Sequence, residues 1–188
     1  DEIAWLLNIR GKDVEYNPLV ISYVVLEQDR CTLFVAPEKV LSIAHSQWGE
    51  RVVIQGYEEV FDYIQQLQGT VLYDGARVNE ALFEAIPAAC RKVNTQSPIL
   101  LMKAKKNAVE LEGERIAMRE DAVALTRFFH WLEEKAFANG QVQTECSIAD
   151  KLHDFRAMGK HFTDESFGTI AGYKGNGAIV HYSAEPAT

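Results

Sequence analysis

Short apolar runs alternate with amphipathic stretches from Asp1 to about Met102, and this alternation limits the possible folds more than any other feature of the chain. A short apolar run is typical of a strand, whereas apolar residues spaced i, i+3 and i+4 are typical of a helix. We expect strands at 3–9, 19–26, 32–35, 70–73 and 99–102, and helices at 38–46, 57–67 and 78–86. The pattern predicts a mixed α/β (α+β) fold class.

Two of these segments allow a more detailed expectation. The run 21–26 is apolar on both faces, which indicates a strand in the interior of a sheet. The helix at 57–67 places its apolar side chains on one face, as an amphipathic helix does. These side chains are Val60, Phe61, Ile64 and Leu67.

A change of composition near Ala104 predicts two units, 1–103 and 104–188. The basic run 103–106 lacks interleaved aromatic residues, so we interpret it as a solvated linker and not as a phosphate site. Directly after it, Asn107 and Glu110 have the spacing of a capping box, which predicts a helix start. This helix should run to about Phe137 and end at Asn139 and Gly140, and a second helix should span 147–158.

The second unit should close with two strands, 166–171 and 177–182, joined by a glycine-rich link at 172–176. A tight turn at this link would deliver the imidazole of His181 from a rigid strand. A single histidine among apolar residues is more often a hydrogen-bonded core residue than a catalyst, so the local pattern leaves both roles open. The link lacks the Gly-Lys-Ser/Thr ending of a nucleotide-binding loop, which excludes that type of site.

Charge and cysteine content exclude several classes of partner. The net charge is −8 and the calculated pI is about 5.2, which opposes general binding to nucleic acid or to an anionic membrane. The three cysteines have neither the spacing of a zinc site nor the density of a disulfide framework, which favours a reducing, cytoplasmic compartment. The remaining histidines have no paired metal-ligand spacing; they are His45, His130, His153 and His161. Small peptides and metal ions remain plausible ligands.

Several segments, taken together, closely resemble one family. They are DEIAWLLNIRG at 1–11, Lys105-Lys106-Asn107, Glu110, Glu112-Gly113 and GNGAIVHY at 175–182. Their order and spacing resemble the three-domain aminopeptidase P (Xaa-Pro aminopeptidase) family, of the pita-bread metallopeptidase class, over residues 1–188. The chain departs from the family at Lys174-Gly175, where relatives often have Gly-Pro.

The resemblance implies a domain assignment. Residues 1–103 would form the second domain, a creatinase/prolidase-type α/β domain whose start is missing, and 104–188 would supply the opening helices and hairpin of the pita-bread catalytic domain. The family's five metal ligands lie beyond the position matched by His181. We therefore expect an internal fragment with no metal ligands before residue 188, inactive alone.

The resemblance also implies a function for the whole protein. It would be a cytoplasmic, homodimeric Xaa-Pro aminopeptidase that removes the N-terminal residue from peptides with proline second, using two divalent ions, usually manganese. His181 would be catalytic and substrate-binding, beside the scissile carbonyl. Two alternatives remain: a metal-free pita-bread module that binds peptides or acts as a chaperone, and a prolidase.

Two residues of the first unit are further binding candidates. Trp48, beside Gly49 in a polar stretch, could pack on a substrate proline ring. Arg10, at the end of the strand expected at 3–9, is suited to a carboxylate or to an acid of another domain.

Overall fold

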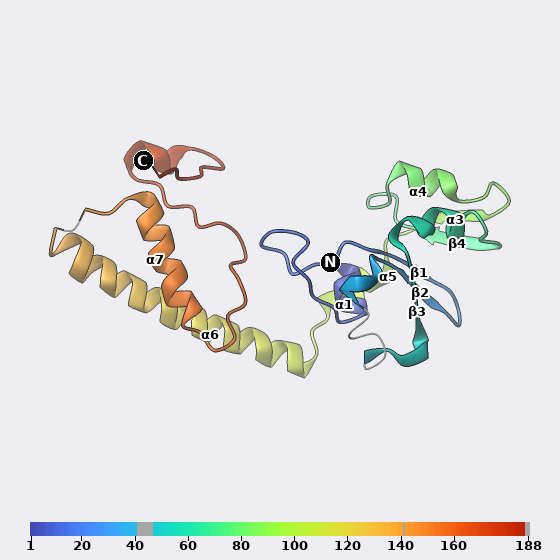
Figure 1. The fold of residues 1–188 in the computed structure, drawn as a ribbon, viewed down its shortest axis with the longest axis horizontal. Coiled ribbons are helices and arrows are strands. Elements are labelled where there is room, and N and C mark those ends of the chain that lie inside the picture. Colours follow the sequence, from blue (N-terminus) through green and yellow to red (C-terminus); the bar gives the residue numbers. More distant parts are fainter. Residues whose placement is uncertain (41–46, 141, 187–188) are drawn as a thin grey trace. The chain divides into compact units, whose positions relative to one another are not determined.

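The computed structural model describes residues 1–40, 47–140 and 142–186. The chain forms two compact units, Asp1–Lys105 and Lys106–Thr188, which are described separately below (Figure 1). Among the described residues, none of the helices combines the length and the apolar composition that a membrane crossing requires.

A three-stranded sheet forms the centre of the first unit. Its order is β1 (Tyr23–Leu26), β2 (Cys31–Phe34) and β3 (Val52–Gln55), with β1 antiparallel and β3 parallel to β2. The strand predicted at 32–35 is confirmed as β2. The interior position predicted for 21–26 is wrong, because β1 is an outer strand and the side chain of Leu26 is 51% exposed. In the described part of this sheet only β2 has a partner on both sides, and its residues Thr32, Leu33 and Phe34 are fully buried.

Both faces of this sheet are covered, because successive side chains of β2 point to opposite sides. One cluster contains Leu33 of β2 and Val35 directly after it; its buried members are Leu7, Ile9, Leu33, Val35, Val40 and Trp48. The other contains Phe34; its buried members are Phe34, Val60, Ile64, Leu82, Ile86 and Cys90. Burial of these apolar side chains is the main source of stability in the unit.

Short helices and a second sheet complete the unit. The helix predicted at 57–67 is confirmed as a 3₁₀ turn (Tyr57–Glu59) leading into α3 (Val60–Ile64), with the predicted apolar face packed on the second cluster. The strand predicted at 70–73 is confirmed as β4 (Thr70–Tyr73), which pairs in parallel with β5 (Arg91–Asn94). The helix predicted at 78–86 is confirmed as α4 (Glu80–Ala85), where the side chain of Asn79 caps the amide of Leu82.

Two predicted strands of this unit are helices instead, and one predicted helix lies mostly outside the described residues. The segments 3–9 and 99–102, predicted as strands, lie largely in helices α1 (Glu2–Leu6) and α5 (Pro98–Ala104). An apolar run this short fits either period, and α5 has proline in its first turn, where a helix tolerates it. Of the segment 38–46, predicted as a helix, Glu38 and Lys39 lie in a 3₁₀ turn (Pro37–Lys39). Residues 41–46, including His45, lie outside the described part.

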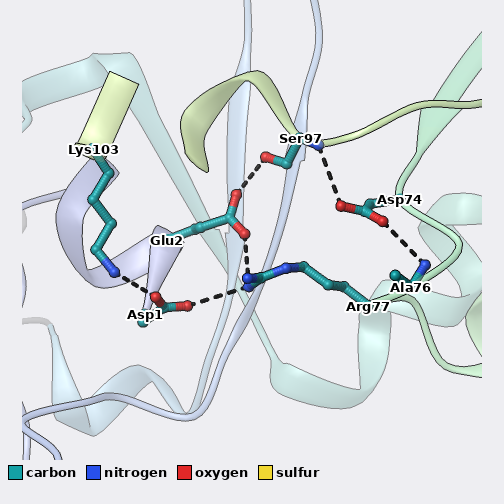
Figure 2. Close-up of polar contacts among 7 residues, drawn as sticks. All are labelled: Asp1, Glu2, Asp74, Ala76, Arg77, Ser97 and Lys103. Carbon is teal, nitrogen blue, oxygen red and sulfur yellow. Dashed lines mark hydrogen bonds and ion pairs between the residues drawn. The ribbon is translucent and has the colours of Figure 1, made fainter. Parts of the chain in front are cut away.

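A polar network joins α1 to α5 and to the loop after β4 (Figure 2). The Glu2 carboxylate accepts from Nη1 of Arg77 at 2.9 Å and from the hydroxyl of Ser97. The Asp1 carboxylate pairs with Nζ of Lys103 and, at 3.5 Å, with Nη1 of Arg77. The network fastens the first helix of the unit to its last.

The second unit is built on two helices. The helix predicted from Asn107 is confirmed as α6 (Ala108–Trp131), continued by a π-helical segment (Leu132–Phe137) to Gly140, which has a positive φ of 62°. The capping box is present: Oδ1 of Asn107 accepts from the amide of Glu110 at 2.9 Å, and Oε2 of Glu110 accepts from the amide of Asn107 at 2.8 Å. The second predicted helix is confirmed as α7 (Glu145–Ala157), which begins after the cap Thr144.

The hairpin predicted at 166–171 and 177–182 is wrong for this structure. Within 142–186 no strand is present, and the segment forms loops around a 3₁₀ helix (Lys174–Ala178). A two-stranded hairpin is only marginally stable without further packing. Here the amide of Tyr173 and the side chain of Asn176 bind a carboxylate of α7, so side-chain contacts determine the path of this segment.

Candidate functional site

The glycine-rich link closes tightly on itself. A Cβ atom placed on Gly172 would lie 2.8 Å from Cα and 2.9 Å from N of Gly177, which no side chain can tolerate. Between these glycines, Lys174 has a positive φ of 51°, in the left-handed region that costs a non-glycine residue on the order of 1 kcal/mol. The link is therefore a compact loop whose backbone approach requires glycine at position 172.

One buried carboxylate holds this loop. Glu145, the first residue of α7, is 5% exposed. Its Oε1 accepts from the amide of Tyr173 at 2.5 Å and from Nδ2 of Asn176 at 3.1 Å. Its Oε2 accepts from the hydroxyl of Tyr182 at 2.5 Å and from Nδ2 of Asn176 at 3.2 Å. The loop is thus fastened to the N-terminal end of α7, where Figure 1 shows the red end of the chain returning to this helix.

His181 lies next to Tyr182, in a turn and not on a strand. Its side chain is exposed and its backbone has a positive φ of 55°. The neighbouring Val180 is 81% exposed, so the segment forms no apolar core around the imidazole. The structure therefore does not give His181 the buried, hydrogen-bonded position of a core histidine. An exposed imidazole on a fastened loop can donate a hydrogen bond to a bound molecule or exchange a proton with it.

Trp48 occupies a different environment, inside the first unit. It is 7% exposed, packs in the cluster with Leu33, and its Nε1 donates to the carbonyl of Leu7 at 2.9 Å. This indole therefore packs in the core and satisfies a carbonyl near the end of α1.

Arg10 also forms hydrogen bonds near the end of α1. Its Nη1 donates to the carbonyls of Ala4 and Ile9, both at 2.8 Å. Neither the carboxylate nor the interdomain acid expected from the sequence is among these partners.

Three acidic residues contact Arg156 and His161 around the loop after α7. Arg156 donates from Nε to Asp121 of α6 and from Nη1 to Glu165, both at 2.7 Å. Nδ1 of His161 lies 2.8 Å from Oε1 of Glu120, and this hydrogen bond holds the pKa of the Glu120 carboxyl below its ordinary value. Ion pairs of Arg156 and the hydrogen bond between His161 and Glu120 therefore hold the loop on α6 and α7.

A dinuclear metal centre does not fit the described residues by themselves. Within 1–40, 47–140 and 142–186, no group of three or more His, Cys, Asp or Glu side chains could hold a metal ion. The buried carboxylate of Glu145 binds hydrogen-bond donors of the loop, as described above.

Sequence reasoning missed Glu145. The available signal was the spacing of Thr144 and Ser147, which form a capping box and so place Glu145 at the first position of α7. A glutamate in a first helical turn is usually explained by the helix dipole and faces water. Its burial depends on residues 173–182 and is visible only in the folded structure.

Comparisons with known proteins cover the entire chain. The family model for the creatinase/prolidase N-terminal domain matches residues 1–110, and that for metallopeptidase family M24 matches residues 112–188. Xaa-Pro aminopeptidase 1 of Dictyostelium discoideum is 39% identical over 194 residues, covering 100% of this chain and 30% of that protein. Aminopeptidase P2 of Arabidopsis thaliana is 35% identical and covers 99% of this chain and 31% of that protein.

Solved structures agree with these relatives. The X-prolyl aminopeptidase of Caenorhabditis elegans, described as a cytosolic enzyme with a di-nuclear active site, superposes with a TM-score of 0.78 at 29% identity. The match covers 89% of this chain and 28% of that one. The Xaa-Pro dipeptidase of Bacillus anthracis, with a TM-score of 0.56 at 14% identity, shares the fold alone.

The chain spans less than a third of the length of these curated relatives. The mixed α/β fold class and the resemblance to the aminopeptidase P family are confirmed. The chain belongs to the creatinase/prolidase family, with a creatinase/prolidase N-terminal domain followed by a segment of an M24 metallopeptidase domain.

Proposed function

We propose that the whole protein is an Xaa-Pro aminopeptidase, which releases the N-terminal residue from peptides with proline at the second position. One observation carries the proposal: two family models match in direct succession over the chain, and relatives with this activity in their names align along almost all of it. Family membership alone would not decide between an active enzyme and a binding module.

Within this protein, we propose that 1–103 belongs to the domain before the catalytic domain, and that 104–188 is the N-terminal part of the catalytic domain. The support is the division of the structure after Lys105 and the change of family model between 110 and 112. The pairing of Lys103 with Asp1 is consistent with a boundary just beyond this residue.

His181 is the residue of this chain that we propose to act on substrate. Its imidazole is exposed and the residues on both sides of it are fastened to α7, so the group is accessible and held. Cleavage of an amide creates an oxyanion, and an imidazole beside the scissile carbonyl can donate a hydrogen bond to it or move a proton. A group in this role typically contributes about 10² to 10⁴ in rate. We do not propose Trp48 as a substrate-binding residue, because it is buried in the first unit.

The proposal includes two divalent metal ions, with manganese as the expected element, held by residues outside these 188. When bound, such a pair supplies an activated water and charge stabilisation. The related C. elegans enzyme has a di-nuclear active site and is cytosolic, which supports the same properties here. We further propose a cytoplasmic homodimer that acts on peptides and binds neither nucleic acid nor membranes, in keeping with the net charge of −8.

The test uses the whole protein, purified with manganese, and three substrates: a pentapeptide with proline second, the same peptide with alanine second, and an Xaa-Pro dipeptide. We expect release of the first residue from the proline pentapeptide, at least about 10²-fold slower release from the alanine peptide, and two metal ions per chain by elemental analysis. Cleavage of the dipeptide alone would identify a prolidase. Peptide binding without metal or cleavage would identify the metal-free module.

A further inference from the structure

The polar cluster around Glu145 is the feature of the second unit that the proposed function does not explain. A carboxylate at the first position of a helix gains from the dipole while it remains in water, so burial is not needed for that purpose. Burial is costly unless the charge is fully hydrogen-bonded. At 5% exposure, Glu145 bears this cost and is compensated by three donor groups from one distant segment.

These donors lie on both sides of His181. Tyr173 and Asn176 precede it, and Tyr182 follows it directly. Nδ2 of Asn176 also donates to the hydroxyl of Tyr182 at 3.0 Å, which links the two sides of the segment. The imidazole itself stays exposed. One carboxylate thus binds the chain before and after His181 while the ring stays accessible.

The identity of the acceptor matters as much as its position. Oε1 and Oε2 each accept two of the hydrogen bonds, so both oxygens must be acceptors. A glutamine would keep the size of the side chain but would turn an NH₂ group toward N–H or O–H donors at one of the two positions. In either orientation this NH₂ group would face Nδ2 of Asn176, so the cluster would lose at least one hydrogen bond and place two donors against each other.

We propose that Glu145 is a positioning residue, whose carboxylate holds segment 173–182 in the conformation that presents His181 to substrate. The effect on catalysis rests on the proposed function, whereas the effect on the conformation of the segment does not.

The first test is a double-mutant cycle in the whole protein with Glu145→Gln, His181→Ala and the combined variant. We expect Glu145→Gln to lower kcat by about 10- to 100-fold with KM within about threefold, since a small displacement of an acting group costs this much. The combined variant should be no slower than His181→Ala, because Glu145 acts through His181. Additive losses would overturn the proposal.

Two control variants separate positioning from stability. Glu133→Gln removes an exposed helical carboxylate and should change neither kcat nor the melting temperature. Leu152→Val loosens the packing of buried Leu152 on α7 without touching the cluster, so it should lower the melting temperature and leave kcat unchanged. If Leu152→Val lowers kcat as much as Glu145→Gln does, Glu145 has a general structural role and the proposal fails.

The second test does not use activity. Hydrogen exchange of the whole protein should show at least about tenfold faster exchange over 173–182 in Glu145→Gln, with α6 and α7 unchanged. If that variant does not fold, Tyr182→Phe removes one donor and should give a smaller change in the same segment. Unchanged exchange over 173–182 would overturn the proposal even in an active enzyme. Absent peptidase activity with faster exchange would instead contradict the proposed function and support the positioning role.

Discussion

The segments 23–34 and 166–182 have similar sequence patterns and different structures. Both contain short apolar runs that predict strands, at 19–26 and 32–35 in the first and at 166–171 and 177–182 in the second. In the first, β1 and β2 form an antiparallel ladder with Tyr23 opposite Phe34, and β3 pairs on the other side of β2. In the second, the chain makes no ladder and its side chains gather around the carboxylate of Glu145. The two segments differ in their packing partners: the first packs within a sheet, and the second contacts a buried carboxylate of α7.

Segment 23–34 is stabilised by burial on both faces of the sheet, whereas 166–182 is held by hydrogen bonds from Tyr173, Asn176 and Tyr182 to Glu145. The hydrophobic effect is non-directional, so burial stabilises a segment without fixing the position of each atom. Hydrogen bonds to a carboxylate, in contrast, require each donor to lie at a defined position. We therefore expect changes in the first segment to act on the free energy of unfolding. Changes in the second should act on the conformation of His181 and on activity.

The largest expected effect is that of Phe34→Ala. Phe34 is fully buried and its ring packs edge-on to Tyr63 at 5.2 Å between centroids. Removing a buried aromatic side chain leaves a cavity and should cost about 3 to 5 kcal/mol in the free energy of unfolding of the 188-residue chain. Urea denaturation measures this loss. Leu72→Ala on β4, where the side chain is 63% exposed, is the control and should cost below about 1 kcal/mol.

Equal losses for the two variants would contradict the comparison. Such a result would mean that the sheet of the first unit does not derive its stability from the buried faces of β2.

The next effect is that of Trp48→Phe, which keeps an aromatic ring in the core and removes the hydrogen bond from Nε1 to the carbonyl of Leu7. We expect a loss of about 1 to 2 kcal/mol in the free energy of unfolding, with no change in KM of the whole protein. Thermal unfolding and peptide kinetics of the same preparation measure both. Unchanged stability with a raised KM would instead support a substrate contact.

A smaller effect is expected from Lys174→Gly. Lys174 has a positive φ of 51°, a conformation that glycine adopts without steric cost. Relief of this strain should raise the free energy of unfolding by up to about 1 kcal/mol. The greater conformational entropy of glycine in the unfolded chain offsets part of this gain. Gly175→Ala is the neighbouring control, and it should be tolerated because a Cβ there meets open space. Destabilisation by Lys174→Gly would show that the loop does not store this strain.

The smallest effect is a pH dependence at the pair of Glu120 and His161. The hydrogen bond from His161 lowers the pKa of Glu120 in the folded chain, so the unfolded chain binds the proton more readily. The resulting stability is present above the ordinary carboxyl pKa of 4.5 and is lost as the pH falls through the lowered value. Thermal unfolding of the parent and Glu120→Gln should therefore differ at pH 6 and converge toward pH 3. Glu114→Gln, an exposed carboxylate of α6, should show no such convergence.

Elements defined by local contacts were predictable from the sequence. The capping box at Asn107 and Glu110 depends on residues three apart, and the amphipathic face at 57–67 depends on one helical period. Both are present as predicted. The runs 3–9 and 99–102 were assigned to the wrong element because a short apolar run satisfies either period. Strands β3 and β5 were not predicted, since their four-residue segments become strands through pairing with β2 and β4.

In the candidate site, too, features set by neighbouring residues were predictable and features set by distant contacts were not. The glycine requirement and the presence of His181 can be read from neighbouring residues. The burial of Glu145 depends on donors 28 to 37 residues away, and that of Trp48 on the carbonyl of Leu7, 41 residues away. Contacts over such separations are set by tertiary packing, which a local pattern does not encode.

The most direct test of the account is His181→Ala in the whole protein, measured as kcat/KM for a proline pentapeptide, melting temperature and metal content. We predict that kcat/KM falls by about 10² or more, roughly 3 kcal/mol of transition-state stabilisation, while melting temperature and metal content are unchanged. Full activity with a melting temperature many degrees lower would contradict the account and make His181 a structural residue. Loss of metal would make it a ligand.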